Sequence, residues 1–203
     1  MDLIISAVEN IIVDTYDNGK YNTFTPENVK AEDILRLVSA RCNGDFSKVE
    51  KIYINMGPGS FTGIRASMAL VLGLVAGKNI SIIPFTTFDA FEYDKLTARQ
   101  ILVVNGFSNF VYVKYKDKGR VKSDCVEIQK LLEYATLNKK EIVSYSKQII
   151  DFFKNHNVKC NQVNFSPMFA VEKHKNGKLE KRLFEPVYLR LSQAELQRKE
   201  NKK

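Results

Sequence analysis

MGPGSFTGIR, residues 56–65, is the stretch of this sequence that decides its fold. It follows a strand-like run of alternating apolar residues, Val49–Asn55, and opens a helix that we expect over 62–76. Glycine allows a positive φ and lets another group approach the backbone closely. The N–H groups at a helix N-terminus also favour an anion. The pattern is neither GxGxxG nor a Walker loop, so a phosphate-binding loop and a plain tight turn both remain open.

The residues that would contact a phosphate or nucleotide in this loop are Gly57, Gly59, Ser60 and Thr62. Either hydroxyl could instead cap the helix. The helix that follows is apolar on all sides from Ala66 to Ala76. Such a helix must be buried all round, whereas a sheet covers only one of its faces. The other face needs a second helical layer, for which residues 31–42 have the required periodicity, or a partner chain, or both.

Periodicity on both sides of the loop predicts an α/β protein with mixed sheets. In the first half we expect strands at 3–8, 10–16, 20–24, 49–55 and 80–84, and helices at 31–42, at 62–76 and from 87. In the second half we expect strands at 101–105, 110–115, 120–126, 141–145 and 158–164, and helices at 127–135 and 147–155. This repeated order indicates two diverged ββ(β)αβαβ halves. We expect domains at 1–99 and 100–185, then a C-terminal helix and basic tail at 186–203.

The composition predicts a globular, cytoplasmic protein. The chain has 203 residues, 44% of them hydrophobic, which is enough for a core. Its longest apolar run, Met68–Ala76, is far shorter than the roughly 20 residues of a membrane helix. Asp2 stands where a secretory signal would carry basic residues. The three cysteines, Cys42, Cys125 and Cys160, have no paired spacing, so neither disulfides nor zinc knuckles are expected.

The formal net charge of +8 is unevenly distributed along the chain. Residues 173–203 contain ten basic and four acidic side chains. A basic tail attracts nucleic acid or an acidic protein, although a solvated end is the more ordinary interpretation. Aromatic residues and lysines between 107 and 116 are a second candidate for RNA contact. Aromatic residues in a strand more often pack against each other in the core.

The stretch MGPGSFTGIR resembles the signature of the TsaB (YeaZ) family. The continuation LVLGLVAGKNISIIPFTTFDAF at 70–91 and the segment EPVYLRLSQAE at 185–195 resemble the same family, whereas residues 106–183 resemble it weakly. The resemblance implies the duplicated actin/Hsp70-like ASKHA fold, which agrees with the two halves read from periodicity. It also implies a non-catalytic scaffold that binds the paralogue TsaD. TsaD and the ATPase TsaE then act in threonylcarbamoyl transfer to a tRNA adenosine, so tRNA is met indirectly.

Departures from the catalytic relatives support a subunit that is not an enzyme. ASKHA ATPases carry an acid in the first strand, where this chain has Ser6 or Ala7, and a Mg²⁺–phosphate site wants a carboxylate oxygen there. The second half begins with Asn105 where the family often has an acid. The two histidines, His156 and His174, lack the spacing of metal ligands. We expect no catalytic residue, no metal and no cofactor.

The resemblance implies that the helices over 31–42 and 62–76 bind TsaD. The expected partner-binding residues are Ile34, Leu35, Val38, Ala66, Ala69, Leu70 and Gly73. In isolation the same face could form a symmetric homodimer. Two alternatives remain open, namely a stand-alone degenerate ASKHA nucleotide-binding protein and a tRNA-binding module. No interaction with a membrane is expected.

Overall fold

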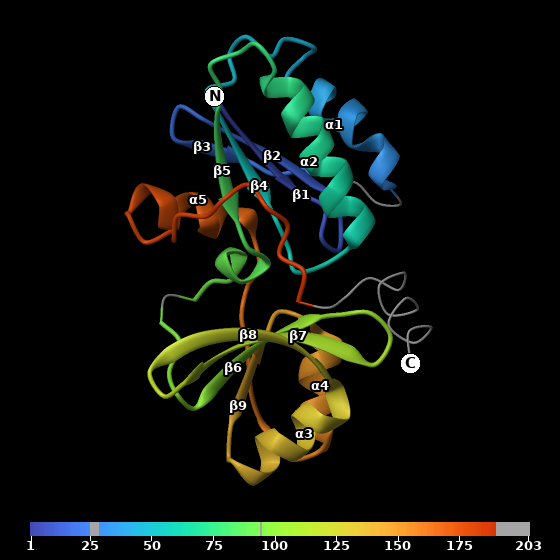
Figure 1. Cartoon of the computed structure of the whole chain (residues 1–203), viewed down its shortest axis with the longest axis vertical. Coiled ribbons are helices and arrows are strands. Elements are labelled where there is room, and N and C mark those ends of the chain that lie inside the picture. The colour runs from blue at the N-terminus through green and yellow to red at the C-terminus, as the bar shows by residue number, and fades with distance from the viewer. Residues whose placement is uncertain (25–28, 94, 190–203) are drawn as a thin grey trace, which may run out of the picture. The chain divides into compact units, whose positions relative to one another are not determined.

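The computed structural model describes residues 1–24, 29–93 and 95–189. Within these ranges the chain forms two compact units, one made of the residues up to 92 with 164–187 and the other of 93–163 with 188–189. Each unit is a mixed five-stranded sheet with helices (Figure 1). No helix within the described ranges is both long and apolar enough to cross a membrane.

The sheet of the first unit has the strand order β3-β2-β1-β4-β5. Its strands are β1 (Asp2–Ser6), β2 (Ile12–Asp17), β3 (Lys20–Asn22), β4 (Lys51–Asn55) and β5 (Ser81–Phe85). The pairs β1–β2 and β2–β3 are antiparallel, whereas β1–β4 and β4–β5 are parallel. All five residues of β1 are buried, as expected for a central strand covered on both faces.

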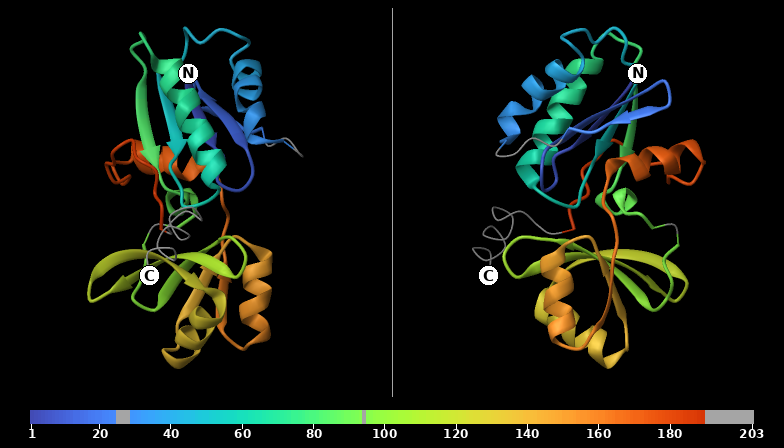
Figure 2. Two further views of the ribbon diagram at one scale, coloured as in Figure 1. Left: turned by 45° about the vertical axis from the view of Figure 1, so that its right-hand side comes forward. Right: turned by 180° about the vertical axis from the view of Figure 1, so that it is seen from behind.

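Helices cover both faces of this sheet (Figure 2). On one face lie α1 (Ile34–Arg41) and α2 (Phe61–Val75), which enclose a core with Leu3, Ile5, Ile52 and Ile54. On the other face lies α5 (Pro167–Lys175), which packs with Ile4, Tyr53 and Phe85. The alternation of side chains along β1 and β4 thus supplies two cores from the same strands. The helix α1 thus lies beside α2 on the same face of the sheet and is not a second layer over it, so Ala69, Leu72 and Gly73 on the outward side of α2 are exposed.

The second unit repeats the strand order of the first, written β8-β7-β6-β9-β10. Its elements are β6 (Gln100–Asn105), β7 (Phe110–Asp117), β8 (Arg120–Glu127), α3 (Ile128–Leu137), β9 (Glu141–Ser144), α4 (Lys147–Asn155) and β10 (Lys159–Gln162). Both helices pack on one face around Ile101, Val103 and Phe153. The first three strands are antiparallel and the last two are parallel, as in the first unit. This correspondence confirms the two diverged halves and the mixed sheets read from the sequence.

Two elements differ from the sequence-based expectations. The helix α5 was not expected, because its nine residues carry too little periodicity, although Ser166 caps it and Pro167 occupies its first turn. The segment from 87 is a short 3-10 turn, η2 (Thr87–Ala90), and not the start of a longer helix. Of the C-terminal helix and basic tail expected at 186–203, residues 186–189 are not helical and the rest fall outside the described residues.

The contact-based units also differ from the expected limits at 99 and 185. The chain enters the second unit at Tyr93 and returns to the first at Asn164. The physical reason for the return is burial, since α5 supplies Ala170 and Val171 to the core that contains Tyr53. Further along, Phe184 and Val187 pack against the core under α1 and α2. The first unit is therefore built from two segments that are distant in sequence.

Polar contacts also hold α5 on the sheet. Nζ of Lys173 donates to the backbone oxygens of Asp89 and Phe91, at 2.8 and 2.9 Å. Nδ1 of His174 lies 2.8 Å from the hydroxyl of Tyr53, with the two rings edge to face. Through these bonds, the polar groups of Lys173, His174 and Tyr53 have partners at the edge of an apolar core. The bonds therefore hold α5 in one position on the sheet.

We predict that Val171→Asp destabilises the first unit by at least about 3 kcal/mol, because it places a carboxylate in the core that joins α5 to the sheet. Urea unfolding followed by circular dichroism measures the effect. The exposed neighbour Glu172 provides the control, since Glu172→Ala should cost less than about 0.5 kcal/mol. Equal unfolding midpoints for the two variants would contradict the docking of α5.

We also predict that acid weakens this docking. Burial and the neighbouring Lys51 lower the pKa of His174 below its ordinary value of 6.5, against a smaller opposite effect of Asp2. The unfolded chain therefore binds the proton first, and stability is lost as the pH falls below about 6.5. The variant His174→Gln should lose less stability than the wild type between pH 7.5 and 5.5. Parallel losses in the two proteins would show that His174 does not carry the effect.

Candidate functional site

The signature loop joins β4 to α2 and lies against the chain that leaves β1. The backbone N–H of Ser60 donates to the oxygen of Val8 at 2.6 Å. The same residue caps α2, since its Oγ accepts from the N–H of Gly63 at 3.2 Å. Of the two hydroxyls that the sequence offered as caps, Ser60 is thus the one used.

Close approach to the chain after β1 explains two of the glycines. A Cβ atom at Gly63 would collide with the backbone oxygen of Ala7, and one at Gly59 would collide with the side chain and backbone of Val8. Gly57 has a φ of +99°, a conformation that other residues adopt only with strain. These glycines therefore serve contacts within the chain itself.

The same contacts occupy backbone donors that a phosphate would need. The N–H of Gly57 donates to Oδ1 of Asn55 at 3.0 Å, and the N–H groups of Ser60 and Gly63 have the acceptors given above. An anion at this loop would compete with protein acceptors for these donors. The arrangement favours the tight-turn interpretation, and the phosphate contacts of Gly57, Gly59, Ser60 and Thr62 stay a prediction.

A neutral hydrogen-bond network fills the space beneath the loop. Nδ2 of Asn55 donates to Oγ of the buried Ser6 at 3.1 Å. The hydroxyl of Thr87 lies 2.7 Å from the backbone oxygen of Pro58 and 3.2 Å from Oδ1 of Asn55. This network lies at the end of β1, the position at which the ASKHA resemblance implies an acid. A buried, uncharged network of this kind stabilises the junction of β1, β4 and η2 without providing a carboxylate.

The other residues singled out from the sequence are divided between the two units. Asn105 ends β6, and a Cβ at Gly106 would collide with the backbone oxygen of Phe110. Nδ1 of His156 lies 2.8 Å from the backbone oxygen of Phe152 in the second unit, whereas His174 belongs to the first. The described part of the chain contains no group of three or more His, Cys, Asp or Glu side chains that could hold a metal ion.

The expected partner-binding residues divide into three groups by burial. Ile34 and Val38 lie inside the core under α1, and their burial argues against direct contact with a partner. Ala66 and Leu70 are half-buried against the same core. Leu35, Ala69 and Gly73 are exposed, Leu35 to 56%. Part of the expected set therefore faces inward, because α1 turns Ile34 and Val38 toward the sheet.

Exposed apolar residues that the sequence analysis did not select complete this surface. Phe61 is 39% exposed at the start of α2, and Leu72 is 52% exposed near its end. The guanidinium of Arg65 lies over the Phe61 ring, 3.9 Å from its centroid. The helices α1 and α2 are in contact, and we call their exposed residues Leu35, Phe61, Arg65, Ala69, Leu72 and Gly73 the α1–α2 face. Because α2 is apolar all round, its sequence alone could not tell which of its residues face outward.

Comparisons with known proteins find a family model and a curated relative that match this chain. The family TsaD, described as tRNA N6-adenosine threonylcarbamoyltransferase, matches residues 28–176, more than half of the chain. The tRNA threonylcarbamoyladenosine biosynthesis protein TsaB of Haemophilus influenzae is 26% identical over 115 residues, which are 55% of this chain and 47% of that protein. The chain thus spans about half the length of this curated relative.

Two solved structures share the fold. YeaZ from Pseudomonas aeruginosa has a TM-score of 0.64, and an uncharacterized protein described as similar to peptidase YeaZ from Pseudomonas aeruginosa has 0.63. Each is 15% identical, and each match covers 93% of this chain and 99% of the other. The fold class and the resemblance inferred from MGPGSFTGIR are therefore confirmed.

Two glycines of α2 provide a matched test of the loop. We predict that Gly63→Ala destabilises the protein by more than about 2 kcal/mol, since the new methyl group meets backbone that cannot move aside. Gly73→Ala should instead stabilise it by up to about 1 kcal/mol, because nothing lies within 4 Å and alanine favours the helix. Urea unfolding measures both. Similar free energies for the two variants would refute the close approach at Gly63.

Proposed function

The chain belongs to the TsaD family, tRNA N6-adenosine threonylcarbamoyltransferase, and from that membership we propose that it is a non-catalytic, TsaB-like scaffold that binds its paralogue TsaD. In this role it supports threonylcarbamoyl transfer to a tRNA adenosine without carrying out the chemistry. The chain then interacts with TsaE and tRNA through the complex. The proposal also assigns the chain to the cytoplasm.

The observation that carries this proposal is the exposed α1–α2 face. Leu35 and Leu72 are each more than half exposed, and the small Ala69 and Gly73 lie beside Leu72 on α2. Small residues let a second helix approach closely, while the leucines supply apolar area that is lost from water on binding. Two helices that present such a face form half of a helical bundle. A paralogue with the equivalent helices provides the other half.

Arg65 adds a directional contact at one end of this face. Stacking on Phe61 holds the guanidinium over the start of α2. Arginine and aromatic residues are enriched among the residues that dominate binding energy at interfaces. The pair gives the α1–α2 face one polar anchor beside its apolar stripe, which favours one orientation of the partner.

The neutral network beneath the loop supports the non-catalytic part of the proposal. Ser6 and Asn55 hold each other by a hydrogen bond, and Thr87 completes the set. A carboxylate at Ser6 would be buried beside uncharged groups, and an unpaired buried charge is costly. The occupied donors of Gly57 and Ser60 likewise give little support to the stand-alone nucleotide-binding alternative.

Charge placed on the α1–α2 face should abolish pairing with TsaD. We predict that Leu72→Glu and Ala69→Arg each lower the affinity for TsaD of the same organism at least 100-fold, about 2.7 kcal/mol. Co-purification and a mass measurement of the complex test this. Leu137→Glu is the matched control, since Leu137 is 84% exposed on α3 of the second unit.

The control variant should keep wild-type affinity, and circular dichroism should show all three variants folded. Wild-type affinity of both Leu72→Glu and Ala69→Arg would exclude the α1–α2 face as the interface. Failure of the unmodified chain to bind TsaD would remove the scaffold proposal itself. A homodimer that Leu72→Glu dissociates, without any complex with TsaD, would point to self-association through this face.

A further inference from the structure

The topology of the second unit brings many basic side chains to one end of its sheet. The strand registers form a row across all five strands, in which Lys159 is opposite Glu141, Glu141 opposite Gln100, and Tyr115 opposite Lys122. Ile101, next to Gln100, is opposite Tyr115. This row marks the end at which the parallel strands β6, β9 and β10 begin, and β7 and β8 meet in a hairpin turn beyond it.

Basic residues gather on and beyond this row. Arg99 precedes β6, Lys139 and Lys140 precede β9, and the backbone oxygen of Arg99 accepts from the N–H of Glu141 at 2.9 Å. The β7–β8 hairpin contributes four more. Lys154 lies in the last turn of α4, and its charge lowers the pKa of the Cys160 thiol of β10, against the larger opposite effect of burial. We call this set the basic end: Arg99, Lys116, Lys118, Arg120, Lys122, Lys139, Lys140, Lys154 and Lys159.

The positive charge of this unit is segregated at the basic end. The nine basic side chains are accompanied by two acids, Asp117 and Glu141. All other positions of residues 93–163 together carry four basic and five acidic residues. The excess positive charge of this stretch therefore lies at one end of the sheet, whereas a merely solvated surface mixes both signs.

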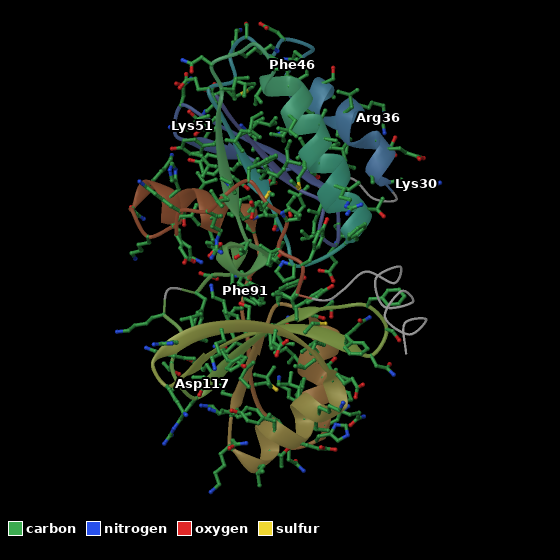
Figure 3. The ribbon with its side chains drawn as sticks, in the orientation of Figure 1. Lys30, Arg36, Phe46, Lys51, Phe91 and Asp117 are labelled. Carbon is green, nitrogen blue, oxygen red and sulfur yellow. The ribbon has the colours of Figure 1, made fainter. Side chains whose placement is uncertain are left out.

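The two acids leave most of the charge uncompensated. Lys122 Nζ lies 2.6 Å from Asp117, and Lys159 Nζ lies 3.6 Å from Glu141. Asp117 sits at the tip of the hairpin (Figure 3), where Lys122, Lys118 and Lys140 all lower the pKa of its carboxyl group. One carboxylate thus faces three ammonium groups. Seven of the nine basic residues are exposed, and Lys116 and Lys140 are half-buried.

An exposed aromatic ring borders the basic end. Tyr134 of α3 is 44% exposed, and Nζ of Lys140 lies 5.8 Å from the centroid of its ring. Lys140 also donates to the backbone oxygen of Ala98 at 2.8 Å, which fixes its position. A partly exposed ring beside a lysine offers a stacking surface for an unpaired base.

We propose that the basic end binds the phosphate backbone of RNA. Five strands about 4.8 Å apart extend over roughly 20 Å, which is wide enough for several consecutive phosphates. Scattered lysines on a rigid sheet suit a partner with many charges of one sign and no required sequence. Because the family acts on tRNA, the identification of that RNA as tRNA rests on the proposed function. The binding surface then lies within this subunit, so tRNA is contacted directly and not only through the complex.

A charge-reversal pair tests the inference on the full-length chain. The probe is an unmodified tRNA transcript, titrated at 50, 100 and 200 mM KCl. We predict that Lys118→Glu with Arg120→Glu lowers the affinity at least tenfold at 100 mM. The slope of log affinity against log salt should become shallower by about 1.4 to 1.8, since each phosphate contact contributes about 0.7 to 0.9. Both residues are exposed at the hairpin turn, so the fold should survive.

The control has the same net charge but leaves the basic end unchanged. Lys130→Glu with Lys147→Glu alters α3 and α4 near their starts and should stay within twofold of the wild type. Equal losses of tRNA affinity in both double variants would show that only net charge matters, and would overturn the proposal. Wild-type affinity of the hairpin variant would overturn it as well. An oligoglutamate peptide that displaces tRNA at equal charge concentration would assign the surface to an acidic protein segment instead.

The result is separable from that of the scaffold proposal. Binding of TsaD to the hairpin variant is measured in parallel and should be unchanged, because the α1–α2 face belongs to the first unit. Loss of tRNA binding with TsaD binding intact supports the basic end. If the wild-type chain binds tRNA but not TsaD, the basic end stands and the scaffold proposal fails.

Discussion

The close approach of α2 to the chain after β1 is the contact on which the rest of the first unit depends. Gly63 and Gly59 leave no room for a side chain against Ala7 and Val8, and Ser60 bonds to Val8 at the same place. This contact sets the position of α2 on the sheet. The position of α2 in turn decides that α1 packs beside it with Ile34 and Val38 inward. The α1–α2 face is what remains exposed. A surface suited to a partner helix therefore depends on the absence of a Cβ atom at Gly59 and at Gly63.

Much of the architecture could be predicted from the sequence, because it follows from local periodicity. Strand alternation and helix spacing predict both halves and their common order, and residue type identifies Ser60 and Thr62 as candidate caps without choosing between them. The outward side of α2 could not be predicted, since an apolar residue looks the same whichever way it points. The helix α5 was also missed, because its stability comes from burial of Ala170 and Val171 against strands more than a hundred residues earlier. Contacts of that range leave no mark on the local pattern.

The two units of the duplication share one strand order but differ in the chemistry of their surfaces. In the first unit most of the exposed residues of α1 and α2 are apolar or small, with Arg36 and Arg65 as the charged exceptions, and the groups beneath the signature loop are neutral. In the second unit the charges collect at the end where the parallel strands begin. The last residue of the first strand is uncharged in both units, since Ser6 ends β1 and Asn105 ends β6. Divergence has thus proceeded at the surfaces, while the buried strands kept their order.

The return of residues 164–187 to the first unit has a consequence for the folding of the protein during its synthesis on the ribosome. At roughly 5 to 20 residues per second, the stretch that follows Glu92 takes about 5 to 20 seconds to reach Val187. During that interval Tyr53 and Phe85 have no α5 to cover them, although their own strands have already been made. The nascent chain therefore displays an apolar sheet surface for many seconds, which makes it a client for chaperones before it can be a partner for any other protein.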